Sequence, residues 1–466
     1  MVSADNLPFD VLPLIFGQLQ VGVDLLSVAL VSRSFFGGVL PLIYEEIEMH
    51  PRLVKRLRHT QSPFETLLKH RDLCPFVRRI AIHAFPRQEG WPSSVIYEQL
   101  ETLFPHLRNL RAFAFTVPDP SSSIDLLLPS LASSTSLKEL SIMGQRINLK
   151  SAELLLGAGH GAVPSLDQGL GLEKLNIKTL SPGLHRALLR WIERNKATLQ
   201  SLSIRHSLSF SDSTLQSILN IVPRLAELKL LHCGNVDHWR VFDALEQADR
   251  LKSLALTILD YSSPPPAVVQ LSSVTRLWLR FNAALSEGAP QNITPSVCGI
   301  LERFRTCQLE TLTLESAGAC PLPAKVVENV RDADFKTLRK LSFAGFTPSN
   351  EQLERICEGC PNLEVLRADL SIDWSRSWAS VASAISKAKR LHTFLSSLAL
   401  QSAESASNTV QGRFAIAEAK ILFAAVPSLQ RIVNANRCWL RGINDSDHPR
   451  YEMVRQRNAS LVLPTV

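Results

Sequence analysis

The residues of this chain that are able to do chemistry are scattered, and few stand at a spacing that a reaction or a metal ion requires. The pair Cys357-x-x-Cys360 has the spacing of one half of a zinc site, but no second cysteine or histidine pair follows it. The glycine-rich segment Gly157–Gly161 lacks the lysine and hydroxyl residue of a phosphate-binding loop. The twelve histidines are dispersed, and no Gly-x-Ser-x-Gly nucleophile motif is present. We therefore expect no catalytic residue, no metal and no cofactor, and no enzymatic activity of the chain itself.

The cysteine pair has a simpler explanation than metal binding. The run Cys360-Pro361-Asn362-Leu363 matches Cys74-Pro75-Phe76-Val77, and both runs lead into the same kind of apolar phrase. Eight cysteines are spread along a chain that we expect to stay in a reducing compartment. We therefore predict buried thiols at a fixed position of a repeat.

A recurring phrase of the form Leu-x-x-Leu-x-Leu indicates the secondary-structure elements that must position any functional residue. Successive copies start 23 to 38 residues apart, which includes the period of leucine-rich repeats. The clearest copies start at Leu172, Leu199, Leu225, Leu251 and Leu309. Weaker copies start at Val77, Leu107, Leu137, Val274, Leu338, Leu363, Leu391 and Leu429.

Each repeat reads as a strand, a loop and a helix. The closing Leu-x-Leu alternates with period two, which is typical of a strand with one buried face. Helical spacing follows it, as in Ser213–Leu219 and Gln352–Cys357. Prolines stop the helices two residues before the next phrase, at Pro105, Pro223, Pro361 and Pro427.

A unit of this size cannot bury its own apolar face, so consecutive units must stack on one another. We therefore predict an α/β solenoid, a leucine-rich-repeat horseshoe with parallel strands on its concave side and helices on its convex side. The residue Cys233, which follows the strand phrase that starts at Leu225, is expected to turn inward and bond backbone groups of the loop.

The first fifty residues do not follow the repeat. Pro8 favours the start of a short helix, and Leu12, Ile15, Phe16 and Leu19 then share one helical face. A second helix is expected over Leu25–Phe35 with Asp24 as its cap, and a third short helix from Pro41 to Tyr44.

This head resembles an F-box. The family pattern is matched in order and spacing over about forty residues by Leu7-Pro8, Asp10, Leu12, Ile15-Phe16, Leu19, Asp24-Leu25-Leu26, Ala29, Val31-Ser32-Arg33, Phe35 and Pro41-Leu42-Ile43-Tyr44. The chain departs from the family at Asp10, where glutamate is usual, and at Phe35-Phe36, where many members carry tryptophan. Both departures keep the chemistry of the family residue.

The resemblance implies that the head docks onto a Skp-family adaptor and, through the adaptor, onto a cullin. A three-helix unit this small buries too little surface to stand alone, so part of its apolar surface must meet another surface. The residues expected at the adaptor are Leu7, Pro8, Leu12, Ile15, Phe16, Leu19, Leu25 and Val31. The competing interpretation is a helical cap that only seals the first repeat.

Strand residues beside the buried leucines are expected to point into the concave face and to bind a substrate protein. The residues chosen from the aligned phrases are Lys178, Arg205, Lys229, Trp278 and Arg280. Tryptophan and arginine are enriched among interface hot spots, and cations beside tryptophan favour acidic or phosphorylated ligands. The alternative is that these are ordinary solvated strand positions.

The 466 residues carry a formal net charge of +7, and 45% of them are hydrophobic, as in a folded soluble protein. Residues 51–80 are basic, with Arg52, Lys55, Arg56, Arg58, Lys69, Arg71, Arg78 and Arg79. They form either a solvated linker and helix face or a surface for nucleic acid or phosphoinositide, and we do not expect nucleic-acid binding.

No run of 18 apolar residues and no signal-peptide pattern is present, so we expect no membrane span and a cytoplasmic or nuclear protein. The expected organisation is an F-box over 1–48, a basic helical linker over 49–75, leucine-rich repeats of about 12 to 13 irregular units over 76–437 and a C-terminal cap over 438–466.

The two halves together imply the substrate-recognition subunit of a Skp–cullin–F-box ubiquitin ligase. The head would hold the adaptor, and the repeats would hold an unknown substrate protein. Two alternatives remain open at this point. One is an interaction scaffold without a role in ubiquitylation, and the other is a basic-surface binder of nucleic acid or phosphoinositide.

Overall fold

The structure of the chain is a computed structural model. It describes residues 7–8, 10–19, 22–51, 54, 62–85, 93–117, 124, 127–132, 134, 136–145, 147, 149, 171–259, 271–282, 289–332, 335–370, 378–396, 416–434, 437–443 and 449–455. The chain forms two compact units, the first of residues 1–225 and 233–235 and the second of residues 226–232 and 236–466. The glycine-rich segment 157–161 lies outside the described residues.

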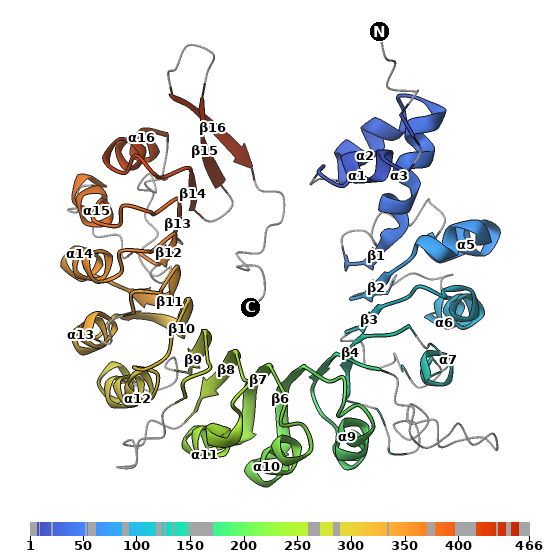
Figure 1. Ribbon diagram of the computed structural model, residues 1–466, viewed down its shortest axis with the longest axis horizontal. Helices are drawn as coiled ribbons and strands as arrows, with labels where there is room; N and C mark the ends of the chain where they lie inside the picture. Colours follow the sequence, from blue (N-terminus) through green and yellow to red (C-terminus); the bar gives the residue numbers. More distant parts are fainter. Residues whose placement is uncertain are drawn as a thin grey trace, which may run out of the picture. The chain divides into compact units, whose positions relative to one another are not determined.

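The first unit begins with a helical head and continues as a parallel sheet with helices along one side (Figure 1). The head consists of α1 (Leu12–Phe16), α2 (Gly22–Ala29) and α3 (Arg33–Glu45). The strands are β1 (Glu46–Met49), β2 (Arg79–Ile82), β3 (Ala112–Phe115), β4 (Glu139–Met143), β5 (Lys174–Lys178) and β6 (Ser201–Ser211). The remaining helices are α5 (Pro63–Lys69), η3 (Arg71–Phe76), α6 (Ser93–Leu103), η4 (Phe104–His106), α7 (Leu128–Ala132), α9 (Pro182–Arg194) and α10 (Asp212–Ile221). The strands pair in chain order, and these pairs are parallel.

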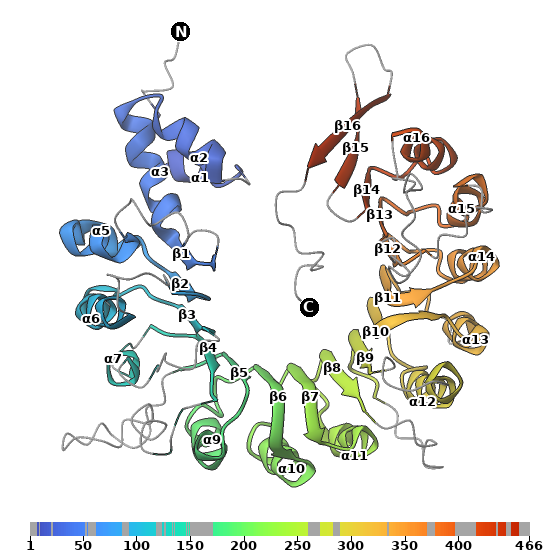
Figure 2. The same ribbon diagram turned by 180° about the vertical axis from the view of Figure 1, so that it is seen from behind.

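The second unit repeats the plan of parallel strands with helices along one side (Figure 2). Its strands are β7 (Glu227–Asn235, up to residue 232), β8 (Ser253–Ile258), β9 (Arg276–Phe281), β10 (Thr311–Pro321), β11 (Lys340–Thr347), β12 (Val365–Ala368), β13 (Thr393–Ser396), β14 (Arg431–Asn434), β15 (Arg437–Ile443) and β16 (Pro449–Arg455). Its helices are α11 (His238–Ala244), η6 (Leu245–Gln247), α12 (Ala289–Arg303), α13 (Ala324–Asp332), α14 (Asn350–Gly359), α15 (Trp378–Ile385) and α16 (Ile416–Ala425). The pairs from β7 to β14 are parallel, and β15 and β16 follow as an antiparallel pair.

The predicted α/β solenoid of leucine-rich repeats is confirmed. The second and third apolar positions of each phrase lie in a strand and are buried, as Leu175 and Ile177 are in β5. These side chains point toward the helices, so neighbouring repeats share one continuous apolar core. We call the sheet face that carries no described helix the open face.

Two details of the repeat register differ from the prediction. The copy assigned to Leu107 begins at Leu110, because Phe113 pairs with Ile80 and Leu140 of the neighbouring strands. Leucines three residues apart made the two registers indistinguishable in the sequence. A strand that was not predicted, β1, precedes the first assigned phrase and pairs with β2.

The repeat helices end where the prolines predict, and serine caps that were not predicted start two of them. Ser181 caps α9, and Ser349 and Gln352 form a capping box at the start of α14. Helix α10 ends at Ile221, two residues before Pro223, and α14 ends at Gly359, two residues before Pro361.

A second set of bonds joins neighbouring repeats and was not predicted. The residue before a phrase often carries a hydroxyl group, which donates to the carbonyl oxygen of the first phrase residue in the preceding repeat. These bonds are Ser136 to Leu110 (2.9 Å), Thr198 to Leu172 (2.9 Å), Ser273 to Leu251 (3.0 Å), Thr337 to Leu309 (2.8 Å) and Ser428 to Leu391 (2.9 Å). Polar groups beside the core are thereby satisfied within the stack.

The predicted cysteine environment is also confirmed for the described residues. Cys74, Cys357 and Cys360 are fully buried. Burial raises the pKa of Cys357 and that of Cys360 to about 12, so both remain protonated thiols at neutral pH. Cys233 turns inward as expected and donates to the Ile204 carbonyl oxygen at 3.7 Å.

Acid should destabilise the first unit through one histidine. Burial lowers the pKa of His185, whose Nε2 lies 3.0 Å from the Thr214 hydroxyl. The unfolded chain therefore binds a proton more readily, and stability falls as the pH drops below the ordinary histidine pKa of about 6.5. We expect His185→Gln to unfold with a weaker pH dependence between about pH 6.5 and 5. Thermal unfolding across that range checks this, with the exposed His70→Gln as control; equal slopes in all three proteins would contradict it.

Candidate functional site

The helical head differs from the prediction in where its helices begin and end. Helix α1 begins at Leu12 and not near Pro8, and α2 begins at Gly22, so Asp24 lies in its first turn and is not its cap. Helix α2 ends at Ala29 and a new helix starts at Arg33, whereas one helix was predicted over Leu25–Phe35. The cause is Ser32, whose side chain accepts a hydrogen bond from the Phe35 backbone N–H at 3.2 Å and so caps α3. Pro41 lies inside α3 and does not open a helix of its own.

The core of the head is small. Leu12, Phe16 and Val39 are buried at its centre, and the ring of Phe16 packs edge-on against Phe35 at 5.1 Å. Helices α1 and α3 approach closely at Gly38, where a Cβ atom would lie 2.6 Å from the Cβ of Leu12. Partly buried apolar side chains surround this centre, among them Leu7, Leu19, Leu25, Val28, Leu42 and Ile43.

Large apolar side chains remain exposed on the same three helices and on the link between α2 and α3. Their exposed fractions lie between 46% for Ile15 and 88% for Leu30. The set comprises Leu14, Ile15, Leu26, Leu30, Val31 and Phe36. Of the side chains predicted to meet the adaptor, Ile15, Val31 and Pro8 are therefore available to a partner, whereas Leu12 and Phe16 face inward and stabilise the head. The exposed residues Leu14, Leu26, Leu30 and Phe36 were not among those predicted to meet the adaptor.

On the open face of the first unit, cations and carboxylates pair between neighbouring strands. Arg79 bonds Glu46 at 2.9 Å, and Lys174 bonds Glu139 at 2.5 Å. Of the predicted substrate residues, Lys178 is exposed at the end of β5, and Arg205 is its register partner on β6. The Arg205 guanidinium bonds the Ser203 hydroxyl at 3.3 Å. The binding roles of Lys178 and Arg205 stay predictions.

On the open face of the second unit, the predicted residues are partly engaged with carboxylates. Lys229 is nearly buried and bonds Glu227 at 2.8 Å. Trp278 donates its indole N–H to Glu315 Oε2 at 3.1 Å, and Arg280 pairs with Glu315 Oε1 at 3.5 Å. The structure thus brings Trp278 and Arg280 together on one carboxylate.

The same face holds two cations that sequence reasoning missed. Arg276 on β9 and Lys340 on β11 are half-buried, and neither forms an ion pair with another described residue. Both pair in register with Thr311 of the strand between them, β10. The sequence does contain a signal for both cations. Each stands directly before the second apolar position of its phrase, which is the position that Lys174 holds in β5.

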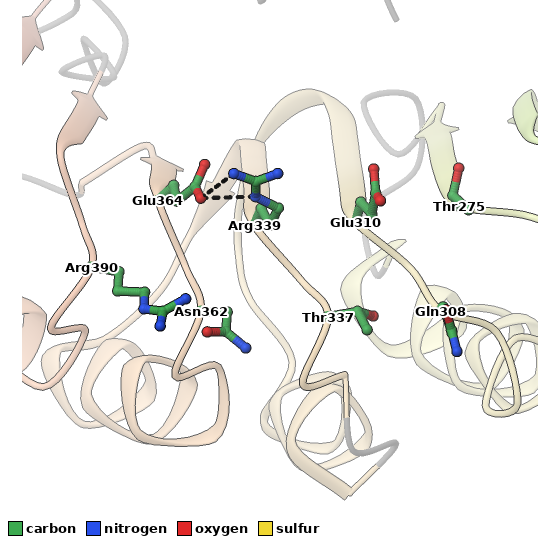
Figure 3. Close-up of a pocket in the computed structure, with 8 residues that line it drawn as sticks. All are labelled: Thr275, Gln308, Glu310, Thr337, Arg339, Asn362, Glu364 and Arg390. Carbon is green, nitrogen blue, oxygen red and sulfur yellow. Dashed lines mark hydrogen bonds and ion pairs between the residues drawn. The ribbon is translucent and has the colours of Figure 1, made fainter.

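A polar groove of about 290 Å³ lies in the second unit, beside the segments that lead into the strands (Figure 3). Its lining residues are Thr275, Gln308, Glu310, Thr337, Arg339, Asn362, Glu364 and Arg390. Arg339 donates to Glu364 from two nitrogens, at 2.8 and 2.5 Å. This bonding lowers the pKa of Glu364. Thr337 and Asn362 already donate to backbone carbonyls of the preceding repeat, so much of the lining is committed to holding the stack together.

The basic segment at residues 51–80 is largely neutralised where the structure describes it. Lys69 pairs with Glu65 at 2.9 Å, Arg78 with Glu45 at 3.4 Å and Arg79 with Glu46 at 2.9 Å. Arg52, Lys55, Arg56 and Arg58 lie outside the described residues. Paired surface cations attract a polyanion less strongly than free ones.

Across the described ranges, no group of three or more histidine, cysteine, aspartate or glutamate side chains is arranged to hold a metal ion. Of the described helices, none is both long and apolar enough to cross a lipid bilayer.

Fold and surfaces define a repeat protein that carries a small helical head. No protein-family model matches the chain, and no curated protein matches it. One similar solved structure is a chain of the crystal structure of the Rad7 and Elc1 complex in yeast, with 13% identity, a TM-score of 0.41, and coverage of 84% of this chain and 86% of that one. Another is the leucine-rich repeat-containing protein LegL7 from Legionella pneumophila, with 14% identity, a TM-score of 0.34, and coverage of 77% and 91%.

Proposed function

We propose that this chain is the substrate-recognition subunit of a Skp–cullin–F-box ubiquitin ligase. The head binds a Skp-family adaptor, the adaptor binds a cullin, and the open face of the repeats binds a substrate protein. The chain does no bond chemistry itself. It raises the local concentration of substrate beside a ubiquitin-loaded enzyme, which is a gain in effective concentration.

The observation that carries the proposal is the imbalance between the inside and the outside of the head. Three side chains are buried at its centre, while six large apolar side chains stay exposed on its surface. An apolar surface of this kind on a soluble protein marks a binding site. The same segment resembles an F-box, and this resemblance implies that the partner is a Skp-family adaptor. A helical cap that only sealed the first repeat would not require large apolar side chains such as Leu26, Leu30 and Val31 to be exposed to solvent.

The test removes exposed apolar side chains and leaves the core of the head intact. We expect the triple variant Ile15→Ser, Leu26→Ser, Val31→Ser to bind a purified Skp-family adaptor at least about 30-fold more weakly than the native chain, because several buried interface contacts are each worth more than about 1 kcal/mol. Thermal unfolding should change little, since these side chains are 46 to 66% exposed and lie outside the core of the head. Biolayer interferometry with immobilised adaptor measures the affinity.

The matched control is Leu208→Ser, which alters a leucine that is 76% exposed in the same unit but outside the head. This variant should bind the adaptor like the native chain. Adaptor affinity that survives the triple variant would reject the head as the docking surface. Adaptor binding by the native chain without cullin in the purified complex would favour a scaffold without a role in ubiquitylation.

A further inference from the structure

The open face over β8 to β11 of the second unit differs in composition from the open face of the first unit, where cations and carboxylates pair between neighbouring strands. Its first row, in register across the four strands, reads Ser253, Arg276, Thr311, Lys340. The second row reads Ala255, Trp278, Thr313, Ser342, and the third reads Thr257, Arg280, Glu315, Ala344. Three cations therefore stand with one carboxylate, and the carboxylate is already shared by Trp278 and Arg280.

Two hydroxyl groups on this surface lack hydrogen-bond partners. The Oγ atoms of Ser253 and Ser342 are buried without a partner, and these residues are 0% and 2% exposed. A buried polar group without a partner costs free energy, so most such groups in folded proteins are bonded. Ser253 is the register neighbour of Arg276, so one unpaired hydroxyl lies beside an unpaired cation.

We propose that this surface binds an acidic segment of the substrate protein, and the proposal rests on the substrate-receptor function proposed above. Arg276 and Lys340 each take one carboxylate of the segment, and the partly exposed hydroxyl group of Thr313 in the second row is a further donor. Trp278 supplies a flat apolar surface between them and Arg280. The excess of positive charge on this surface favours an oxygen anion as the ligand group.

The spacing favours two carboxylates over a single phosphate group. Arg276 and Lys340 are separated by one strand, which places their backbones about 9.6 Å apart at the usual distance between strands. Three residues of a polyproline II chain span about 9.3 Å, and their side chains return to the same side of the chain because this helix has three residues per turn. Carboxylates three residues apart therefore match the two cations, which flank Thr311 in register.

The experiment selects peptides from a random display library on the full-length native chain and on the charge-reversal variant Arg276→Glu, Lys340→Glu. The native chain should enrich peptides with Asp or Glu at two positions three residues apart. The variant should lose that enrichment, and individual selected peptides should bind it at least about tenfold more weakly, because opposed pairs become like-charged pairs. The control Arg250→Glu, Lys325→Glu reverses the same residue types at exposed sites off the open face and should select like the native chain.

A native chain that selects no acidic pattern, or one whose acidic pattern survives in the charge-reversal variant, would overturn the proposal. A parallel array of singly phosphorylated peptides gives the remaining arm. Binding there without any binding of two-carboxylate peptides would also overturn it, in favour of a phosphate ligand. Adaptor affinity is measured on the same variants and should not change, so failure here is distinguishable from failure of the docking head.

Discussion

Replacing Gly345 by alanine is expected to lower the stability of the second unit by about 2 to 4 kcal/mol, as strain at a special backbone conformation and a steric clash do elsewhere. Gly345 has a φ of +73°, in the left-handed region that L-residues avoid. A Cβ atom there would lie 2.4 Å from the carbonyl oxygen of Ser316, which is backbone and cannot rotate away. The Gly345 N–H also donates to Asp369 at 2.6 Å, so a shift of this segment would lose that bond. Denaturant unfolding followed by circular dichroism measures the loss.

The same repeat position in the first unit provides the opposite change as a control. Thr179 follows Lys178 as Gly345 follows Ala344, and it holds a φ of 60° with a branched side chain. Thr179→Gly removes that strain and should stabilise the first unit by about 1 kcal/mol. If the Gly345→Ala variant unfolded at the same denaturant concentration as the native chain, the backbone conformation at Gly345 would not be a constraint on the fold.

Truncating Arg303 to alanine is expected to cost the second unit about 3 to 5 kcal/mol, in the range of large-to-small changes at buried sites. Arg303 is 1% exposed at the end of α12, and its guanidinium lies over the rings of Trp239 and Phe242 at 5.1 and 5.6 Å. It also pairs with Asp243 of α11 at 3.4 Å. Alanine would remove the packing between the two helices together with the charge.

The variant Arg303→Met separates packing from charge. Methionine fills most of the same volume, and Asp243, whose side chain is 56% exposed, remains solvated when its partner is lost. We therefore expect a loss of less than half that of Arg303→Ala. Thermal unfolding of both variants and of Asp243→Asn compares them, and equal losses for methionine and alanine would mean that the charge, not the packing, stabilises this contact.

Most of the repeat fold was predictable because it depends on local pattern. Period-two leucines indicate strands, and the prolines at Pro223 and Pro361 mark helix ends, whatever the neighbouring repeats contain. The strand β1 was missed because its phrase, Tyr44-x-x-Ile47-x-Met49, lacks leucine and lies inside the segment assigned to the head. The break between α2 and α3 was missed because the side chain of Ser32 competes with a continuous apolar pattern.

The candidate site was harder to predict, because pairing between strands depends on residues far apart in the chain. Arg280 is held by Glu315, which arrives one repeat later, and no property of the phrase around Arg280 indicates that bond. The exposed apolar residues of the head were partly predictable from helical spacing. Helical spacing identifies a shared face but not whether that face turns inward, which is why Leu12 and Phe16 were grouped with Ile15.

The hydroxyl bonds between repeats all run in one direction along the chain. In each of them, from Ser136 to Ser428, the donor belongs to the later repeat and the acceptor carbonyl to the earlier one. During synthesis, every repeat that leaves the ribosome therefore meets an acceptor edge that is already complete. We therefore expect the chain to fold in the cell from the amino terminus, one repeat at a time. A chain that lacks its last repeats would still fold its first ones, whereas a chain that lacks its first repeats would offer no acceptor edge to the later ones.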